Sequence, residues 1–382
     1  MPPVAQEGNC LIYRGSNFLK QRLVLSCLSG KPVKITQIRS EDEMAPGLRE
    51  YEISLIRLFD KLTNGTKIEL NPAGTSVMFS PGLLHGGHVE HDCCVQRGIG
   101  YYLDALIALG PFCKMPLKCH LRGVTNSKDS PSVDHVKGGA LSLLKRFLLI
   151  DEGLELRVVR RGVAPLGGGE VVFTCPVRKS LRAIQFQQQG MVKRIRGTVY
   201  ACKVSPAMAN RTVESAKGCM LKFLPDVYIY TDQNRGKMSG NSPGFGICLL
   251  AETTDGVCFA ADCISNTREE SDTPSIPEDL GREAAMRLLD EIYRGGCCDS
   301  AYQWLAALYM ALGQKHVSKF LTGALSTYTV YFLQHLRDFF SITFKLENPE
   351  IDEDEEDDVR GAQKVLMTCV GIGYTNISKR VL

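Results

Sequence analysis

Apolar and polar positions change their spacing along the chain, and the changes follow a repeated order. Residues 17–30 carry apolar side chains at helical spacing and end on a glycine, and residues 31–39 then alternate as a strand. A second amphipathic stretch at 48–65 closes on Asn-Gly, and two short alternating stretches follow at 66–70 and 75–79. The pattern predicts a unit with the element order α-β-α-β-β.

The same order recurs in the next part of the chain. Helical spacing returns at 96–110 and 132–149, and strand patterns occur at 116–124, 154–161 and 169–175. The sequence therefore predicts a second unit that matches the first.

A third copy is predicted near the C-terminus. Its helices are expected at 300–313 and 326–340 and its last two strands at 341–347 and 364–371, whereas the strand between the helices has the weakest pattern. The last two strands flank the acidic loop 352–358, which is too charged to pack. We expect a solvated loop there, with docking to a basic partner surface as the alternative.

The spacing of equivalent helices indicates an insertion. Helices of the first two units lie roughly 85 residues apart, but those of the second and third lie roughly 190 apart. The additional segment has its own strand patterns and a helix at 207–224, so it can fold as a separate α/β domain. The expected segments are 1–184 with units one and two, the insert 185–285, and 286–382 with unit three.

Composition narrows the class of protein. The chain has 382 residues, 44% of them hydrophobic, and its net charge of +3 is too small to mark the whole surface as a nucleic-acid binder. No leader pattern and no run of about 18 apolar residues occurs, so neither secretion nor a membrane span is expected. The fifteen cysteines lack zinc-finger spacing and are interpreted as free thiols of a reducing compartment, the cytosol or nucleus.

The most specific motif lies between two predicted strands, where residues 161–171 read R-G-x-x-P-x-G-G-G-x-V. Gly167, Gly168 and Gly169 let backbone amides approach an anion or another chain segment, and Arg161 adds a fork of donors. A tight hairpin that needs glycine at positive φ is the alternative. The pattern resembles the signature of the RNA 3′-terminal phosphate cyclase family, and the resemblance covers nearly the whole chain.

This resemblance implies the fold. Members of the family consist of three β-α-β-α-β-β modules, similar to the C-terminal domain of a translation initiation factor and arranged as in the enolpyruvyl transferases. They also carry a smaller inserted α/β domain. The expected class is therefore a mixed α/β (α+β) fold, which agrees with the element order of the pattern.

The resemblance also indicates a lost activity. The cyclases attach AMP to a histidine ahead of the second helix of unit three, and Tyr328 stands at that position here. A phenol with a pKa of about 10 supplies little nucleophile at neutral pH, and neither His316 nor His335 aligns with the site. The glycine-rich N-terminal loop of the cyclases is also shortened, at 13–17. We therefore expect no catalytic residue and no cofactor.

Basic residues near the lost site are candidate anion contacts. By resemblance, Lys20 stands where the cyclases carry arginine, Arg39 is retained, and Tyr51 replaces a glutamine. With Arg161, the two basic residues could form a phosphate pocket that has lost its chemistry.

Two basic clusters are candidate RNA contacts, because such clusters neutralise phosphates whatever the base sequence. An ordinary solvated surface is the alternative. Strand alternation predicts that Arg157 and Arg160 point to opposite faces. One cluster lies on and beside a predicted strand and the other opens the insert, and together they contain Arg157, Arg160, Arg161, Lys193, Arg194 and Arg196.

Three histidines have spacings that could suggest zinc. His88 and His91 follow H-x-x-H spacing, and His85 precedes them. Gly86 and Gly87 instead predict a loop that enters a helix, and the resembled family implies no metal. No metal site is expected.

The leading functional hypothesis follows from the resemblance. It implies a non-catalytic factor of the small-subunit processome in the nucleus and nucleolus, needed for early cleavages of precursor rRNA. Its implied partners are a large nucleolar GTPase and precursor rRNA, contacted directly or indirectly. The alternative is an endoribonuclease acting on precursor rRNA, although no acid–base pair or metal cluster for cleavage is evident. An active RNA cyclase ranks third.

Overall fold

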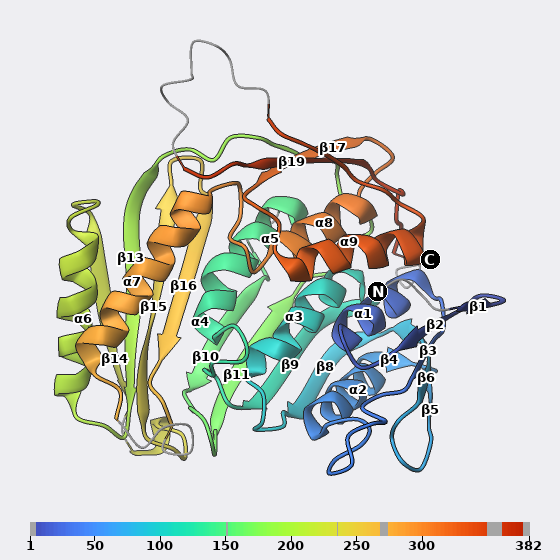
Figure 1. Ribbon diagram of the computed structural model, residues 1–382, viewed down its shortest axis with the longest axis horizontal. Helices are drawn as coiled ribbons and strands as arrows, with labels where there is room; N and C mark the ends of the chain where they lie inside the picture. Colours follow the sequence, from blue (N-terminus) through green and yellow to red (C-terminus); the bar gives the residue numbers. More distant parts are fainter. Residues whose placement is uncertain (1–4, 150–151, 235, 268–273, 350–360, 377–382) are drawn as a thin grey trace.

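The chain forms a body of three similar α/β units with a smaller α/β domain at one end (Figure 1). The acidic loop 352–358 lies outside the described part of the chain. No described helix is both long and apolar enough to cross a membrane. The computed structural model describes residues 5–149, 152–234, 236–267, 274–349 and 361–376.

Unit one confirms the helices and strands predicted for the N-terminal part. Helix α1 ends where Gly30 adopts a left-handed conformation and donates its amide to the Ser26 carbonyl. Helix α2 starts where the Glu52 carboxylate accepts the Arg49 amide at 2.8 Å. The elements are β1 (Ala5–Glu7), β2 (Cys10–Arg14), α1 (Leu19–Ser29), β3 (Val33–Thr36), α2 (Glu50–Leu62), β4 (Thr63–Asn64), β5 (Lys67–Leu70), β6 (Val77–Ser80) and β7 (Leu83–Leu84).

Unit two contains an interrupted second helix. A π-helical turn at Val136–Ala140 separates two α-helical segments, and a Cβ on Gly139 would lie 2.8 Å from the Asp299 carboxylate. The helix therefore changes its winding where it meets unit three. The elements are β8 (Gly86–Asp92), α3 (Ile99–Leu109), a 3₁₀ turn (Gly110–Phe112), β9 (Met115–Gly123), α4 (Val133–His135), α5 (Leu141–Leu148), β10 (Glu155–Arg160) and β11 (Gly169–Cys175).

Unit three is split by the insert. Its first strand precedes the insert and pairs in parallel with a strand that follows it. The weakly patterned strand between the two helices is present. The elements are β12 (Gln185–Phe186), α8 (Gln303–Leu312), β17 (Val317–Thr322), α9 (Thr327–Phe340), β18 (Lys345–Glu347) and β19 (Val365–Val370).

The three units share one strand arrangement. In each, the first strand is parallel to the second, the fourth is antiparallel to the second, and the third lies outside the fourth. This is the β-α-β-α-β-β order implied by the resemblance, so the expected mixed α/β fold is confirmed.

The α-β-α-β-β pattern lacked the first strand of each unit. The loop expected around His85–His91 is wrong for most of its length, because Gly86–Asp92 forms β8. Of the side chains of β8 that point inward, only Val89 is a large apolar residue, since His91 is buried on the same face. Strand β12 has only two residues. Neither strand is long or apolar enough to show an alternating pattern.

A β-bulge in β10 changes which face its arginines occupy. The register pairs Val158 with Val171 and Arg160 with Glu170, so two residues of β10 oppose one of β11. Arg157 pairs with Val172, which lies on the same face of β11 as Glu170. The prediction that Arg157 and Arg160 point to opposite faces is therefore wrong, because the extra residue restores them to one face.

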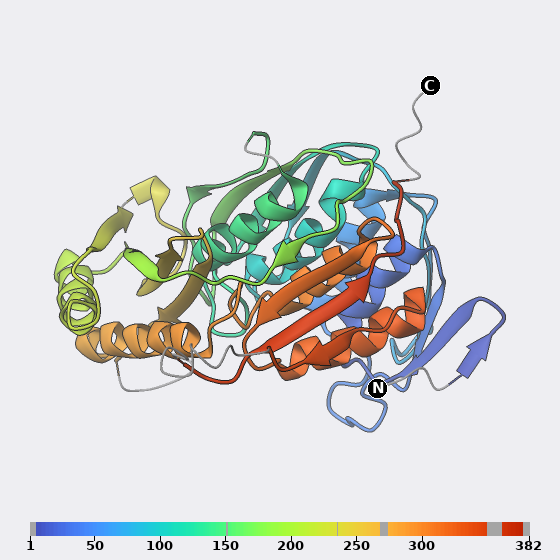
Figure 2. The ribbon, with the colours of Figure 1, turned by 90° about the horizontal axis from the view of Figure 1, so that it is seen from above.

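The first helices of the units form the centre of the body. Every residue of α8 is buried, and so is every residue of α3 except Tyr101. Helices that are apolar on all sides must be enclosed. Helix α1 packs against α3 and α9, α8 packs against α9, and the sheet of unit three lies across these helices (Figure 2).

The insert is an antiparallel and parallel sheet covered on one face by two helices (Figure 1). Its strand order is β14-β13-β15-β16. Leu280, Ala284 and Leu288 form one continuous buried stripe on α7, so the expected boundary at 285 falls inside this helix. The elements are β13 (Val192–Cys202), α6 (Pro206–Met220), β14 (Val227–Asn234), a 3₁₀ turn (Gly236–Met238), β15 (Gly244–Thr253), β16 (Cys258–Ile264) and α7 (Pro277–Arg294).

Candidate functional site

Lys20 lies at the junction of the three units. Its Nζ is 2.5 Å from Oδ2 of Asp104 on α3, and 4.7 Å from the ring centre of Tyr101. Burial opposes the charge on Lys20, but the attraction of Asp104 and Tyr328 raises its pKa above the ordinary value. Lys20 is therefore charged, and Asp104 already neutralises it.

Tyr328 occupies the first turn of α9, close to Lys20. Its ring centre is 6.0 Å from the Lys20 Nζ and 6.0 Å from the Trp304 ring. Its carbonyl accepts a hydrogen bond from Gln21 Nε2 at 3.1 Å. Burial raises the pKa of Tyr328 although Lys20 opposes this effect. The phenol therefore keeps its proton at neutral pH and is a weak nucleophile.

The shortened N-terminal loop covers this position. Phe18 has a left-handed backbone, with φ of 60°, and its ring lies 4.6 Å from Tyr331 and 6.0 Å from Tyr328. Arg22, which the sequence analysis did not identify, is fully buried and donates to the Gly15 carbonyl at 2.9 Å. The loop is thus held down over the first turn of α9.

Arg39 lies on the far side of a small aromatic cluster. It forms a bidentate ion pair with Glu52 at 2.8 and 2.9 Å, and its Nη2 is 3.5 Å from the Tyr51 hydroxyl. The Tyr51 ring meets the Tyr101 ring edge to face at 5.7 Å. Lys20 and Arg39 are therefore connected through two tyrosines, and each is paired with its own carboxylate.

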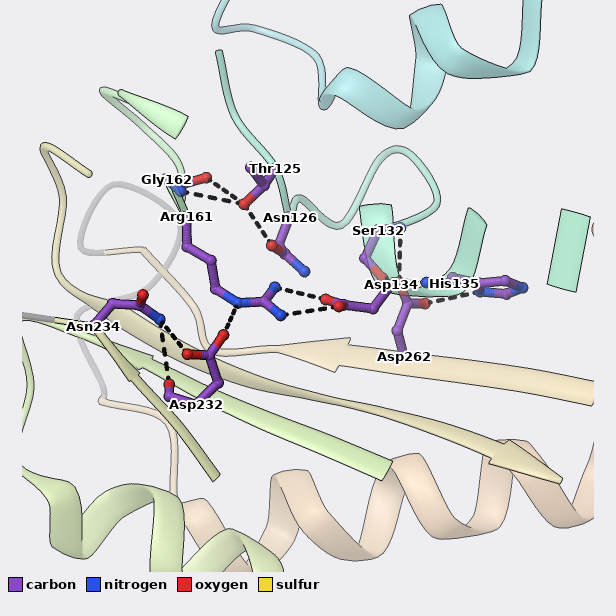
Figure 3. Close-up of polar contacts among 10 residues, drawn as sticks. All are labelled: Thr125, Asn126, Ser132, Asp134, His135, Arg161, Gly162, Asp232, Asn234 and Asp262. Carbon is purple, nitrogen blue, oxygen red and sulfur yellow. Dashed lines mark hydrogen bonds and ion pairs between the residues drawn. The ribbon is translucent and has the colours of Figure 1, made fainter. Parts of the chain in front are cut away.

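Arg161 belongs to a different place, between unit two and the insert (Figure 3). Its Nη1 and Nη2 lie 2.6 and 2.9 Å from the Asp134 carboxylate, and its Nε lies 2.5 Å from Oδ2 of Asp232 on β14. The guanidinium also stacks 4.9 Å from the Tyr200 ring centre, and Arg161 is 4% exposed. Two carboxylates occupy its donors, so this arginine joins two parts of the fold.

His135 extends the same network toward unit three. Its Nδ1 is 3.5 Å from Asp262 on β16, and its Nε2 is 3.1 Å from Asp299. Burial opposes the charged imidazole, but the two carboxylates raise its pKa well above the ordinary value. Sequence reasoning missed His135 and its partners, because residues so far apart in the chain form no local pattern.

A cavity of about 400 Å³ opens beside this network. Its lining includes Ser132 and Asn126 from unit two and Asp262 and Arg287 from the insert. Asn126 is buried, and its Nδ2 has no partner among the described residues. The cavity is the polar seam between the two parts.

The glycines of the motif pack against backbone. A Cβ on Gly162 would lie 2.2 Å from the Gly169 amide nitrogen, and one on Gly240 of the insert would lie 2.3 Å from the Gly167 carbonyl. The Gly167 carbonyl accepts the Asn241 amide at 2.8 Å. Of the three uses considered for these glycines, the geometry shows the close approach of another chain segment, and Gly167 and Gly168 also have the positive φ that a tight turn needs. Anion binding by Gly167, Gly168 and Gly169 stays a prediction.

The cluster that opens the insert is balanced by acidic partners. Lys193 and Arg194 share Glu252 at 2.7 and 2.6 Å, and Arg196 is bidentate to Asp226 at 2.7 and 3.1 Å. The pairs lie at the surface, where each contributes little to stability.

In the cluster on β10, two of the three arginines have no acidic partner among the described residues. Within the described residues, neither Arg157 nor Arg160 forms an ion pair, and the Arg160 Nε is buried without a partner. The bulge places both side chains on the same face of the sheet.

The three histidines do not converge. His88 is exposed, and its ring lies 5.0 Å from that of His120 at an angle of 45°. His91 points to the opposite face, where its Nε2 shares a hydrogen bond of 2.9 Å with Ser54 Oγ. Burial lowers the pKa of His91 to about 4. Among the described residues, no group of three or more His, Cys, Asp or Glu side chains could hold a metal ion.

Comparison with known proteins agrees with the geometry of the fold. The family model described as RNA 3′-terminal phosphate cyclase matches residues 11–346. A probable RNA 3′-terminal phosphate cyclase-like protein of Drosophila melanogaster is 89% identical over all of both chains. The Homo sapiens RNA 3′-terminal phosphate cyclase-like protein is 56% identical, over 98% of this chain and 99% of its own. A protein of Schizosaccharomyces pombe named as an rRNA processing protein is 42% identical, over 98% and 99% of the two chains.

The family match covers most of the chain, and the curated relatives align with it over nearly their full lengths. Three repeated units and the inserted domain are present as the resemblance implied. The chain therefore belongs to the RNA 3′-terminal phosphate cyclase family, among its cyclase-like proteins.

Proposed function

We propose that this protein acts in rRNA processing, as a non-catalytic assembly factor of the small-subunit processome in the nucleolus. The observation that carries the proposal is the 42% identity, over 98% of the chain, to the relative named as an rRNA processing protein. In this proposal the protein works with a large nucleolar GTPase and is needed for early cleavages of precursor rRNA. Precursor rRNA is its second partner.

The former nucleotide site supports the absence of cyclase chemistry. A phenol whose pKa is raised by burial stands at the position of the nucleophile, and Asp104 already neutralises the neighbouring Lys20. Phe18 covers both the first turn of α9 and the ring of Tyr328. A nucleotide phosphate would have to compete with Asp104 for the lysine and displace the aromatic cover.

The proposal is tested by purifying the tagged protein gently from nuclear extract, with a tag-only control. Precursor small-subunit rRNA and the large GTPase are quantified with and without ribonuclease. We expect both to be enriched, and the GTPase to remain after ribonuclease because protein–protein docking is primary. If neither is enriched, the proposal fails, and the purified chain is then assayed for cleavage of precursor rRNA.

Restoring the lost histidine is expected to leave the protein inactive as a cyclase. Tyr328→His supplies an imidazole, but Lys20 stays paired with Asp104 and Phe18 still covers the site. Incubation with radiolabelled ATP and magnesium should therefore give no covalent adenylate above that of the control Tyr331→His, on the same helix. A stable adduct on Tyr328→His alone would show that the surrounding site has kept its nucleotide chemistry.

A further inference from the structure

We propose that the insert carries a stacking platform for single-stranded RNA, formed by Tyr228 and Tyr230 on β14. The two ring centres lie 4.4 Å apart, and the residues are 54% and 56% exposed. Half-exposed rings gain only part of the free energy that burial of an aromatic side chain provides. Every nucleobase has a flat face that can stack on such rings, whatever its sequence.

The platform lies on the face of the insert sheet that the two helices leave uncovered. The parallel register places Tyr228 beside Arg196, Tyr230 beside Thr198, and Asp232 beside Tyr200. Side chains of alternate residues share a face, so both tyrosines lie on the same side as Asp232.

Asp232 lies two residues along β14 from Tyr230, and its carboxylate pairs with Arg161 of unit two. The two tyrosines therefore lie next to the contact between the insert and the body, on the part of the sheet face that remains exposed. A strand of RNA lying on them would run along the side of the insert that faces unit two.

The charged side chains near the rings should attract a phosphate backbone only weakly, because each is paired with a group of opposite charge. Lys193 and Arg194 share one carboxylate, that of Glu252, and Arg196 has Asp226. With Arg161, Asp134 and Asp232 at the joint included, four cations face four carboxylates, so the charged groups around the platform balance. Stacking should therefore dominate the affinity, and the salt dependence should be shallow, with a slope on the order of one.

The exposed geometry favours single strands over duplexes. Bases within a duplex are stacked on one another, whereas unpaired bases can be splayed onto aromatic side chains. The outer edge of β14 could also accept a strand of a partner protein, because β14 ends its sheet in the described part of the chain. The exposed ring faces favour RNA, and a protein occupant is an outcome of the test.

This inference deepens the proposed function, since it rests on a direct contact with precursor rRNA. The full chain is titrated into a fluorescently labelled, unstructured 12-nucleotide RNA, and anisotropy is measured at several salt concentrations. We expect the combined change Tyr228→Ala and Tyr230→Ala to weaken binding by about tenfold or more, because each stacked base contributes on the order of 1 kcal/mol or more.

Two control variants and one control ligand make the result specific. The combined change to phenylalanine keeps both ring faces and should bind as the unchanged protein does. Tyr293→Ala removes a tyrosine that is 63% exposed on α7, away from the platform, and should also bind normally. A labelled duplex of the same length should bind more weakly than the single strand.

Other outcomes overturn the inference. If the unchanged protein does not bind the RNA, no base stacks on these rings. The same follows if the alanine and phenylalanine variants bind equally well. If the alanine variant keeps RNA binding but loses a protein from nuclear extract after ribonuclease, the face docks a protein. The proposed function is judged separately, because retention of the GTPase after ribonuclease does not require the tyrosines.

Discussion

Arg161→Met is expected to lower the free energy of unfolding by about 3–5 kcal/mol. The substitution removes a side chain that pairs with both Asp134 and Asp232, and leaves two carboxylates close together at the seam. Removing one partner of a buried ion pair costs more than the pair itself contributes, because the remaining charge stays desolvated. This applies chiefly to Asp134, whose side chain is 15% exposed, whereas that of Asp232 is 40% exposed. Urea unfolding of the full chain, followed by circular dichroism, measures the change.

The matched control is Arg157→Met. Arg157 is exposed and has no ion pair among the described residues, so its loss should change the free energy of unfolding by less than about 0.5 kcal/mol. Adding Asp134→Asn and Asp232→Asn to Arg161→Met should recover part of the loss, since neutral amides are less costly to leave unpaired. An equal, small effect of both arginine substitutions would contradict a joining role for Arg161.

Gly162→Ala is expected to lower the free energy of unfolding by about 3 kcal/mol or more. The new Cβ would lie 2.2 Å from the Gly169 amide nitrogen and 2.6 Å from the Gly167 carbonyl oxygen. These are backbone atoms, so no side chain can rotate away, and the whole turn must shift. Because Gly167 also contacts Gly240, the shift would move the insert relative to unit two.

Gly218→Ala provides the control for glycine removal. Gly218 lies in α6, where a Cβ would have nothing within 4 Å and the backbone needs no positive φ. Alanine in a helix should raise the free energy of unfolding by up to about 1 kcal/mol. A neutral effect of Gly162→Ala, measured by the same urea unfolding, would show that the glycine motif tolerates side chains and does not fix the joint.

The periodic parts of the fold could be predicted from the sequence. Helices α2 and α9 have one apolar face and defined ends, so their spacing alone located them to within a few residues. The first strands of units two and three were not predicted, because the buried face of β8 carries a histidine beside its one large apolar residue and β12 has only two residues. The face of Arg160 was mispredicted because a bulge adds one residue, which no periodicity rule can reveal.

The site was only partly predictable. Resemblance located Lys20, Arg39, Tyr328 and the glycine motif, but not the carboxylates that occupy the basic side chains. Asp104 lies 84 residues from Lys20, and Asp232 lies 71 residues from Arg161. Pairs so distant meet only through the packing of whole units. A basic residue in a sequence therefore shows a charge but not whether an acidic partner already neutralises it.

The division of unit three by the insert affects the order in which the chain can fold during synthesis. Strand β12 pairs with β17, and the Ile184 amide bonds to the Ser318 hydroxyl, 134 residues later. At ribosomal rates of about 5–20 residues per second, this partner follows after roughly 7–27 seconds. Units one and two have emerged by then, and so has the insert. Helices α1 and α3 of these two units therefore keep apolar surface exposed until α8 and α9 have been synthesised. During this interval chaperones can bind the nascent chain.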